Sequence, residues 1–210
     1  VGINLRDILL LSPELSLLAL AVAVLGIDLF VKRKGLILSI ALLGLLLPLI
    51  AGIVLWNEVH TTGVQTAFNG ALVVDKFALY FKFLIIGILG LLFVSAWGYS
   101  SSFRPYQAEF HGLMLLSSTG LMLLPAVGDL ITLYVSLELA SLPVIALAAF
   151  TKSRTESTEA GMKYLVLSAV SSAVLLYGFA FLYGATGTLR LVSDNPLDPA
   201  IIHILAASDS

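Results

Sequence analysis

The sequence contains no cysteine. This absence excludes a disulfide framework, thiolate-held iron–sulfur clusters and cysteine-based zinc sites within the chain. Charged residues are also scarce, at 11% of 210 residues, whereas soluble proteins carry about 25%. The net charge is −2, and no basic cluster is longer than Lys32-Arg33-Lys34. This charge pattern argues against nucleic-acid binding.

Long apolar runs make up most of the chain. Hydrophobic residues account for 59% of it, and several runs approach or exceed the roughly 18 residues typical of transmembrane helices. The first run is followed by neither a small-residue cleavage site nor a soluble domain, so we expect no removed signal peptide. The sequence therefore predicts an all-α fold, a polytopic transmembrane helix bundle.

Polar breaks between the apolar runs predict six helices. Three fall within residues 1–109 (13–31, 36–56 and 77–98), and three within residues 110–184 (110–127, 130–150 and 159–184). Pro48 is expected to kink the second helix, and Ser157 or Thr158 to cap the sixth. Residues 57–74 are expected to form a polar, turn-prone loop, and residues 185–210 a loop and the start of an incomplete next segment, a helix beginning near Pro199.

Basic residues are unevenly divided between the two sides of this bundle. The loops after the first, third and fifth helices contain Lys32, Arg33, Lys34, Arg104, Lys152 and Arg154, whereas the opposite side has Arg6, Lys76 and Arg190. Loops rich in Lys and Arg favour the cytoplasm. The pattern predicts a multi-pass protein of the cell inner membrane, with the N-terminus outside, on the periplasmic side.

One acidic residue interrupts the predicted fifth helix. Residues 130–150 span roughly 30 Å at about 1.5 Å per residue, enough to cross a bilayer core. Glu138 lies near the middle, where an acidic residue costs roughly 2.5–3.5 kcal/mol on insertion. Five residues later, Pro143 cannot donate to the carbonyl of Leu139, which leaves that carbonyl for water or a side chain. Glu138 is therefore either a proton-handling carboxylate or a neutral acid that joins two helices by a hydrogen bond.

Other ionisable residues near the helices have simpler interpretations. Lys82 lies roughly 8 Å into its helix, within reach of the interface by snorkelling. His111 is interpreted as a solvated or capping histidine, and Asp28 as an interface residue that faces the basic loop after it.

Lys163 is the second candidate for a functional charge. It lies about 6 Å into the sixth helix from the cytoplasmic side and Glu138 about 18 Å, so their depths differ by roughly 12 Å and we expect no direct salt bridge. A lysine side chain covers about half of that gap, leaving the rest to water or another side chain. Lys163 either snorkels to the interface or is a movable cation that changes the affinity of Glu138 for a proton.

The sixth helix also has a pattern that favours close packing, and the chain as a whole has no enzymatic motif. Small residues recur at four-residue spacing in Ser168, Ala169, Ser172 and Ala173, which predicts a face for another helix. There is no Ser/His/Asp grouping, no metal-ligand cluster and no nucleotide motif between a strand and a helix.

Three stretches carry a resemblance to a known family. They are GDLITLYVSLELASLP at Gly128–Pro143, EAGMKY at Glu159–Tyr164 and LYGATGTL at Leu182–Leu189, and VDKFA at Val74–Ala78 supports them. The chain is similar in these motifs to subunit N of the proton-pumping NADH-quinone oxidoreductase, respiratory complex I. Its sister subunits L and M and the sodium/proton antiporter proteins share the glutamate of the fifth helix but differ around it.

The resemblance implies an antiporter-like membrane subunit that translocates protons while NADH reduces quinone elsewhere in the complex. Glu138 matches the family's fifth-helix glutamate and Lys163 its sixth-helix lysine, and both are implied in proton translocation. The chain would thus be a subunit of a translocase with no redox site of its own. No cofactor is expected in it, because NADH, flavin, iron–sulfur clusters and quinone would bind other subunits.

The resemblance also sets expectations for partners and extent. The implied partners are the antiporter-like and small membrane subunits of complex I and the lipid bilayer. The family has two inverted repeats of five helices, with a lysine on a broken seventh helix that pairs with the glutamate. On this resemblance, the chain is expected to be an N-terminal part that ends before that helix.

Two other functions stay open on the sequence alone. One is a structural subunit of the same complex, in which the charges only hold helices together. The other is a stand-alone cation/proton antiporter.

Overall fold

The computed structural model describes residues 4–28, 35–99, 106–191 and 200–208. Most of these residues are helical, as the apolar runs predict. The helices are α1 (Leu5–Leu10), α2 (Ser12–Asp28), α3 (Gly35–Gly44), α4 (Leu46–Thr62), α5 (Lys76–Tyr99), α6 (Gln107–Leu123), α7 (Leu130–Ala148), α8 (Thr155–Thr186) and α9 (Ile201–Ser208).

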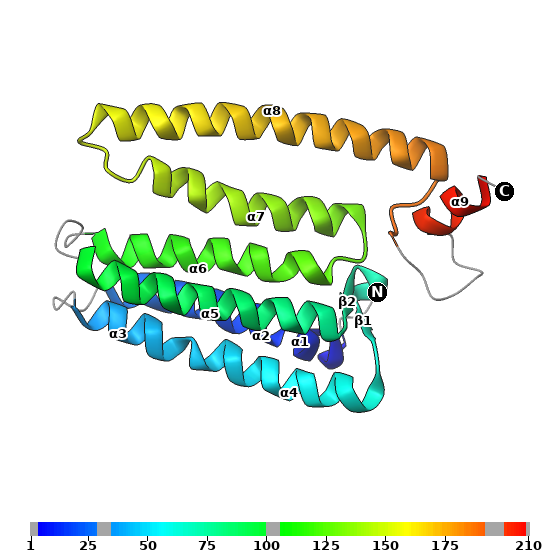
Figure 1. Ribbon diagram of the computed structural model, residues 1–210, viewed down its shortest axis with the longest axis horizontal. Helices are drawn as coiled ribbons and strands as arrows, with labels where there is room; N and C mark the ends of the chain where they lie inside the picture. The colour runs from blue at the N-terminus through cyan, green and yellow to red at the C-terminus, as the bar shows by residue number, and fades with distance from the viewer. Residues whose placement is uncertain (1–3, 29–34, 100–105, 192–199, 209–210) are drawn as a thin grey trace.

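The longer helices run side by side along one direction (Figure 1). Within the described residues, four spans are long and apolar enough to cross a membrane: 37–62, 76–96, 130–148 and 155–186. The helices α2 and α6 have 17 residues each and lie among these spans. The fold is a multi-pass membrane helix bundle, as predicted.

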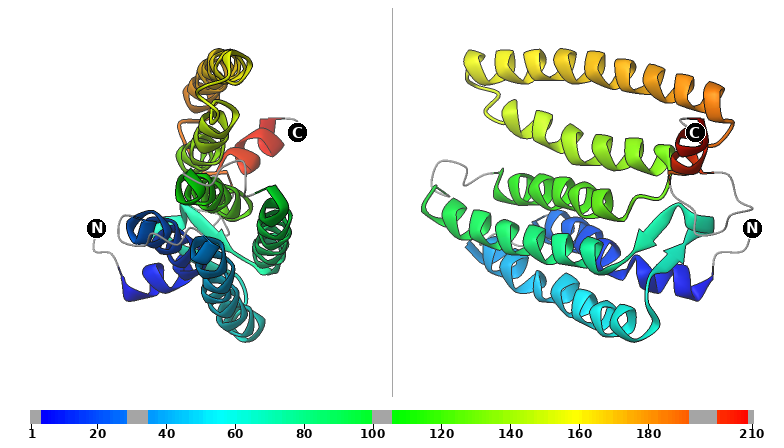
Figure 2. Two further views of the ribbon diagram at one scale, coloured as in Figure 1. Left: turned by 90° about the vertical axis from the view of Figure 1, so that its left-hand side faces the viewer. Right: turned by 45° about the vertical axis from the view of Figure 1, so that its right-hand side comes forward.

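The bundle has two parts of different thickness. Seen end on, α6, α7 and α8 stand in single file, whereas α2, the α3–α4 pair and α5 gather on the far side of α6 from α7 (Figure 2). One apolar cluster joins α2, α3, α5 and α6 and includes Leu17, Ile37, Phe93 and Leu115. Because lipid is as apolar as leucine, the close fit of such side chains stabilises the bundle.

Pro48 acts where the sequence predicts a kink. It has no N–H to donate to the carbonyl of Gly44, and α3 ends at Gly44 while α4 begins at Leu46. The predicted end of this second helix at residue 56 was too early, because α4 continues to Thr62.

The predicted loop 57–74 contains a β-hairpin instead. Strand β1 (Gln65–Ala67) pairs antiparallel with β2 (Leu72–Val74), with Ala67 opposite Leu72. A 3-10 turn, η1 (Phe68–Gly70), joins them. Asn69 adopts φ 57° and Gly70 φ 86°, a left-handed pair that suits a tight turn. Three-residue strands are too short to show a period-two pattern, so no pattern in the sequence predicts them.

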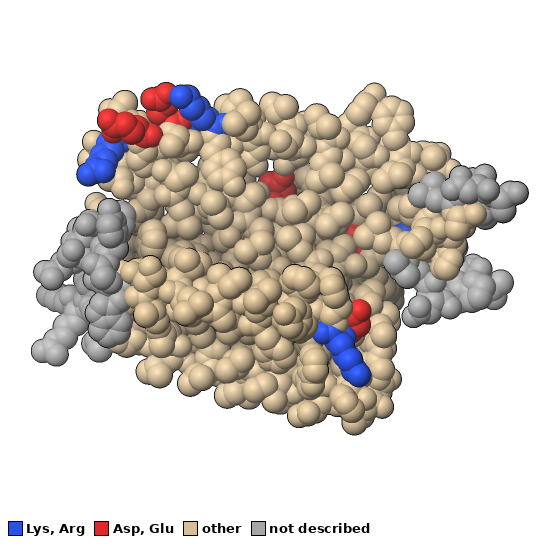
Figure 3. Space-filling model, viewed as in Figure 1, with Lys and Arg blue, Asp and Glu red and all other residues tan. Residues whose placement is uncertain are grey.

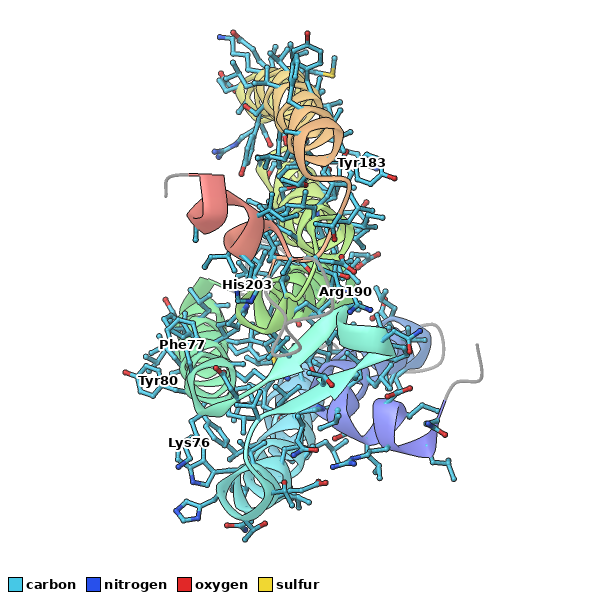
Figure 4. The ribbon with its side chains drawn as sticks, turned by 90° about the vertical axis from the view of Figure 1, so that its right-hand side faces the viewer. Lys76, Phe77, Tyr80, Tyr183, Arg190 and His203 are labelled. Atoms are coloured by element: carbon cyan, nitrogen blue, oxygen red, sulfur yellow. The ribbon has the colours of Figure 1, made fainter. Side chains whose placement is uncertain are left out.

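The hairpin connects the loops at one end of the bundle. Residues 124–126 form a 3-10 turn, η3 (Leu124–Ala126), after α6, and Gly128 N donates to Ala71 O at 2.8 Å. A Cβ on Gly128 would lie 1.9 Å from Gly70 O, so only glycine fits. Arg190, which follows α8, donates to Asn69 O at 3.0 Å and lies beside the hairpin (Figure 4).

The start of α8 differs from the prediction. The helix begins at Thr155, four residues earlier than expected, and Arg154 at its N-cap makes no side-chain cap. The Ser157 hydroxyl instead donates to Ala148 O at 2.8 Å and accepts from Thr151 N at 3.2 Å. Ser157 therefore closes the turn between α7 and α8. A helix from Ile201 to Ser208 confirms the one expected near Pro199.

The predicted small-residue face of α8 is half correct. Ser168 and Ser172 are partly buried, whereas Ala169 and Ala173 are exposed. The partly buried positions continue along α8 at spacings of three and four, as one face of a helix requires, and this face packs on α7.

Candidate proton site on α7

Local hydrogen bonds fix where α7 begins. Asp129 caps the helix, and its Oδ1 accepts from Thr132 N at 2.6 Å. Leu130 N donates to Leu189 O at 3.0 Å, so the segment after α8 also holds this end. An aspartate N-cap typically stabilises a helix by about 1 kcal/mol.

The middle of α7 lies unusually close to α6. A Cβ on Gly120 would lie 2.3 Å from Ala140 N, which is backbone. Next to this contact, the Ser117 hydroxyl of α6 donates to Ala140 O at 2.7 Å. The close approach and the hydrogen bond together fix the position of the residues around Glu138.

Glu138 lies on the opposite side of this contact, toward α8. Its side chain is half-buried, about 12 Å along the helix from Leu130. The Ser172 hydroxyl of α8 donates to Glu138 Oε1, and the Tyr134 hydroxyl one turn earlier also hydrogen-bonds this carboxyl group. Acidic atoms are recessed in the middle of this apolar face, whereas other charged side chains lie at its ends (Figure 3).

Pro143 is buried, and α7 continues through it. The sequence predicts an unpaired carbonyl at Leu139, and the structure gives a side-chain partner to the carbonyl of the next residue, Ala140. The Ser141 hydroxyl also approaches the Glu138 carbonyl, at 3.4 Å. Backbone acceptors thus lie within one turn of the Glu138 carboxyl group.

An apolar pocket of about 300 Å³ opens between α7 and α8 on the hairpin side of Glu138. Tyr134 lies in its wall, and the same tyrosine hydrogen-bonds Glu138. The other lining residues are Leu130, Ile131, Leu176, Phe179, Ala180, Tyr183 and Leu189, and Tyr183 is labelled at the end of α8 in Figure 4. The Tyr134 hydroxyl therefore links the wall of the pocket to the Glu138 carboxyl group.

Lys163 does not meet Glu138 in this structure. Its side chain is 70% exposed, and Nζ lies 2.5 Å from Glu159 Oε1, one turn earlier on α8. This arrangement agrees with the roughly 12 Å difference in depth calculated from the helix rise. An exposed pair at this spacing contributes about 0.3–0.5 kcal/mol, so it restrains the lysine weakly.

Lys82 belongs to a buried ion pair that the sequence pattern did not reveal. Its Nζ lies 2.7 Å from Glu14 Oε1, and the two side chains are only 1% and 3% exposed. The predicted snorkelling of Lys82 was wrong, because its side chain turns inward to the carboxylate of α2. Lys82 and Glu14 each lie within two turns of the helix end on the same side of the bundle. This shared depth was the only sign in the sequence that they could pair.

His111 is also buried rather than solvated. It is 2% exposed, and its Nδ1 lies 2.5 Å from Gln107 O on the preceding turn of α6. The rings of Phe93 and Phe110 contact it edge-on. Aromatic neighbours on two helices cover the imidazole, which the sequence position at a helix start did not reveal. Across the described ranges, no three His, Cys, Asp or Glu residues gather to hold a metal ion.

Comparison with known proteins agrees with the geometry around α7. The family model described as "NADH:quinone oxidoreductase/Mrp antiporter, TM" matches residues 127–195, which include Glu138 and Lys163. Subunit N of the Desulfitobacterium hafniense NADH-quinone oxidoreductase is 40% identical over 190 residues, which cover 87% of this chain and 38% of that protein. This chain is a relative of NADH-quinone oxidoreductase subunit N.

Other relatives of subunit N type extend the comparison. Subunit N of the Methanosarcina mazei F(420)H(2) dehydrogenase is 32% identical, over 91% of this chain and 40% of that one. A chain of respiratory complex I from Thermus thermophilus has the same fold, with a TM-score of 0.69 and 31% identity over 88% of this chain and 40% of that one. The chain therefore spans about two fifths of the length of these relatives.

Proposed function

We propose that the protein is a proton-translocating, antiporter-like membrane subunit of an NADH-quinone oxidoreductase. NADH oxidation and quinone reduction would take place in other subunits, and this one would couple them to proton pumping. Its partners would be the other membrane subunits of that complex. The similarity to subunit N over nine tenths of the chain supports the assignment.

The observation that carries the proposal is the placement of Glu138. A half-buried carboxyl group lies in the middle of a membrane span, held by hydroxyls from α7 and α8. Hydroxyl groups both donate and accept hydrogen bonds, so Ser172 and Tyr134 can serve Glu138 as an acid or as a carboxylate. The described residues place no cation against it, and a cation that approaches would favour the charged form.

Lys163 is proposed to modulate the affinity of Glu138 for a proton. Its weak pairing with Glu159 leaves the lysine free to move. Swinging toward Glu138 would shorten the gap by about half, and water would bridge the rest. Lys163→Gln, which keeps a polar side chain, is expected to lower the pumping rate without loss of the complex.

The protein is proposed to have its N-terminus outside, in the periplasm. Lys152 and Arg154 lie in the α7–α8 turn on the side proposed to be cytoplasmic, while the other four basic residues of that side lie outside the described ranges. Since the chain has no cysteine, a single introduced one reports sidedness. An impermeant thiol reagent should label Thr66→Cys in intact cells, and Ser153→Cys only after permeabilisation; the reverse would invert the topology.

Glu138→Gln in the full-length subunit tests the function. The variant keeps the shape and the hydrogen bonds but cannot release a proton, so the assembled complex should pump fewer protons per electron. Glu156→Gln, at an exposed position in the first turn of α8, is the matched control and should pump normally. Unchanged stoichiometry and rate in the Glu138 variant would refute the proposal, and failure to assemble would favour a structural role.

One finding favours a second candidate function. A chain of the Mrp complex from Dietzia sp. shares the fold, with a TM-score of 0.64 and 25% identity over 90% of this chain and 36% of that one. The protein would then be a cation/proton antiporter-type subunit outside NADH oxidation. Ion movement in vesicles containing this subunit without redox partners would support that candidate.

A further inference from the structure

The ion pair between Glu14 and Lys82 is unusually well enclosed. Both side chains are at most 3% exposed, and the pair joins α2 to α5. Taking two charges out of water costs several kcal/mol per ion. The chain has few charged residues, yet two of them lie here among apolar helices. Leucine at these positions would pack without the free-energy cost of removing a charge from water.

Apolar layers lie on both sides of the pair along the helices. A second apolar cluster, the hairpin-side cluster, includes Leu10, Leu55, Leu72 and Leu79. On α5, Leu79 belongs to it, and Ile86 belongs to the central cluster, which is the one that joins α2, α3, α5 and α6. Leu10 and Leu17 flank Glu14 in the same way. The pair is therefore a charged layer between two apolar layers, about 9 Å along α5 from Lys76.

One acceptor atom in this layer is unused. Lys82 approaches Glu14 Oε1, and Glu14 Oε2 is buried with no hydrogen-bond partner among the described residues. A buried carboxylate oxygen without a partner is costly. A proton on that oxygen would remove the buried negative charge, and so would a proton moved from Lys82 to Glu14.

The depth of the pair matches that of Glu138. Val127 pairs with Leu72 in a β-bridge, so α5 and α7 begin in one layer, at Lys76 and Leu130. Lys82 lies about 9 Å and Glu138 about 12 Å from these starts. The helix α6 separates them, and it has three consecutive buried hydroxyl residues, Ser117, Ser118 and Thr119.

These residues lie on two faces of α6, one toward α7 and one toward α2 and α5. Ser117 donates to Ala140 O on α7. Thr119 and Ser118 fall between Leu115 and Met122, which pack with α2 and α5 in the central cluster. Helical spacing therefore directs them to the α2–α5 side. Buried polar groups thus cross the bundle at one depth, from Glu14 and Lys82 through α6 to Glu138 and Ser172.

We propose that Glu14 and Lys82 form a second proton-exchange site within the membrane. In the exchange step, an Nζ–H bond of the Lys82 ammonium breaks and an O–H bond forms on Glu14 Oε1, which leaves a neutral amine and a neutral acid. The amine then takes up a proton from the aqueous phase through hydrogen-bonded water, and the acid gives its proton back to water, which restores the ammonium–carboxylate pair. The ligand of the site is the proton, and each exchange transfers one proton.

Other charged groups on the surrounding elements lie away from the pair. Arg6 and Asp7 on α1, Glu58 and His60 on α4, and Asp75 and Lys76 at the start of α5 are at element ends, and none of them is buried. On α6, Glu109 and His111 lie in the first two turns, at the far end of the helix.

Infrared spectroscopy of the full-length protein in lipid vesicles tests the exchange. A change of pH should produce a carboxylic-acid C=O band that is lost in Glu14→Gln and retained in Glu156→Gln. The charge exchange Glu14→Lys with Lys82→Glu should restore a band. Absence of any band assigned to Glu14 over the accessible pH range would overturn the proposal.

Pumping by the assembled complex provides the second readout. Glu14→Leu with Lys82→Met removes both charges and leaves no unpaired ion, so the bundle should fold. The inference, which in this step rests on the proposed function, predicts a lower pumping rate in this double variant and recovery in the charge-exchanged one. A normal rate would show a purely structural pair. If Glu138→Gln alone leaves pumping unchanged while the Glu14 band persists, the proposed function fails and the exchange site stands.

Discussion

Glu14 and Glu138, acidic residues of two different helices of the bundle, are held in opposite ways. Glu14 lies in the thick part of the bundle with a cation 2.7 Å away and almost no exposure. Glu138 lies in the single file of α7 and α8, half-buried, with hydroxyl partners from Ser172 and Tyr134. With its counter-ion at this distance, Glu14 changes its charge together with Lys82, whereas hydroxyl partners serve both the acid and the carboxylate form of Glu138. The comparison indicates that Glu138 is the acid better suited to change its protonation state by itself.

Packing around the two acids differs in the same direction. In the apolar 18-residue stretches of α3–α4 and of α5, 33% of the residues are buried, whereas none is buried in the corresponding stretch of α8. Gly161 is the one buried residue of α8, all of which is described. Within this chain, the surroundings of Glu14 are therefore packed more closely than the α8 side of Glu138.

The largest expected effect is the loss of one partner of the ion pair. Glu14→Leu leaves the Lys82 ammonium buried without a counter-charge, and should lower the free energy of unfolding by about 3–5 kcal/mol. The double variant with Lys82→Met should be close to wild type. Unfolding of the full-length protein in mixed micelles measures both, and equal losses in single and double variants would contradict the account.

A smaller effect is expected where α6 meets α7. Gly120→Ala places a methyl group 2.3 Å from Ala140 N, which forces the helices apart at a cost of about 1–3 kcal/mol. Gly178→Ala on α8 is the matched control, because its Cβ meets nothing within 4 Å. The same unfolding measurement should separate them. Equal stabilities would mean that α7 tolerates displacement.

The smallest effect is expected at the hydroxyl that holds Glu138. Ser172→Ala removes the hydrogen bond from α8, and such bonds in membrane proteins average about 0.6 kcal/mol. The pumping rate should fall while the complex still assembles. Ser171→Ala, at the exposed neighbouring position, should leave the rate unchanged, and a similar loss in both variants would indicate a general effect of the helix.

Sequence reasoning located the spans and Glu138 because each depends on residues close together in the chain. An apolar run and an acid at its centre are visible without any partner. The Asp129 cap is equally local, because its Oδ1 accepts from the backbone N–H of Thr132, three residues later.

The missed features all depend on distant residues. Lys82 turns inward because of Glu14, which lies three helices earlier in the chain, on α2. His111 is covered by Phe93 of α5. The hairpin is held by Gly128 and Arg190. Such contacts form only after the helices assemble, so no local pattern reports them.

The most direct measurement is the protonation of Glu138 during turnover. Time-resolved infrared difference spectra of the assembled complex, compared between wild type and Glu138→Gln, isolate the signal of this carboxyl group. The account predicts a C=O band that appears and disappears as NADH is oxidised and that is missing in the variant. A Glu138 that keeps one protonation state throughout turnover would contradict it.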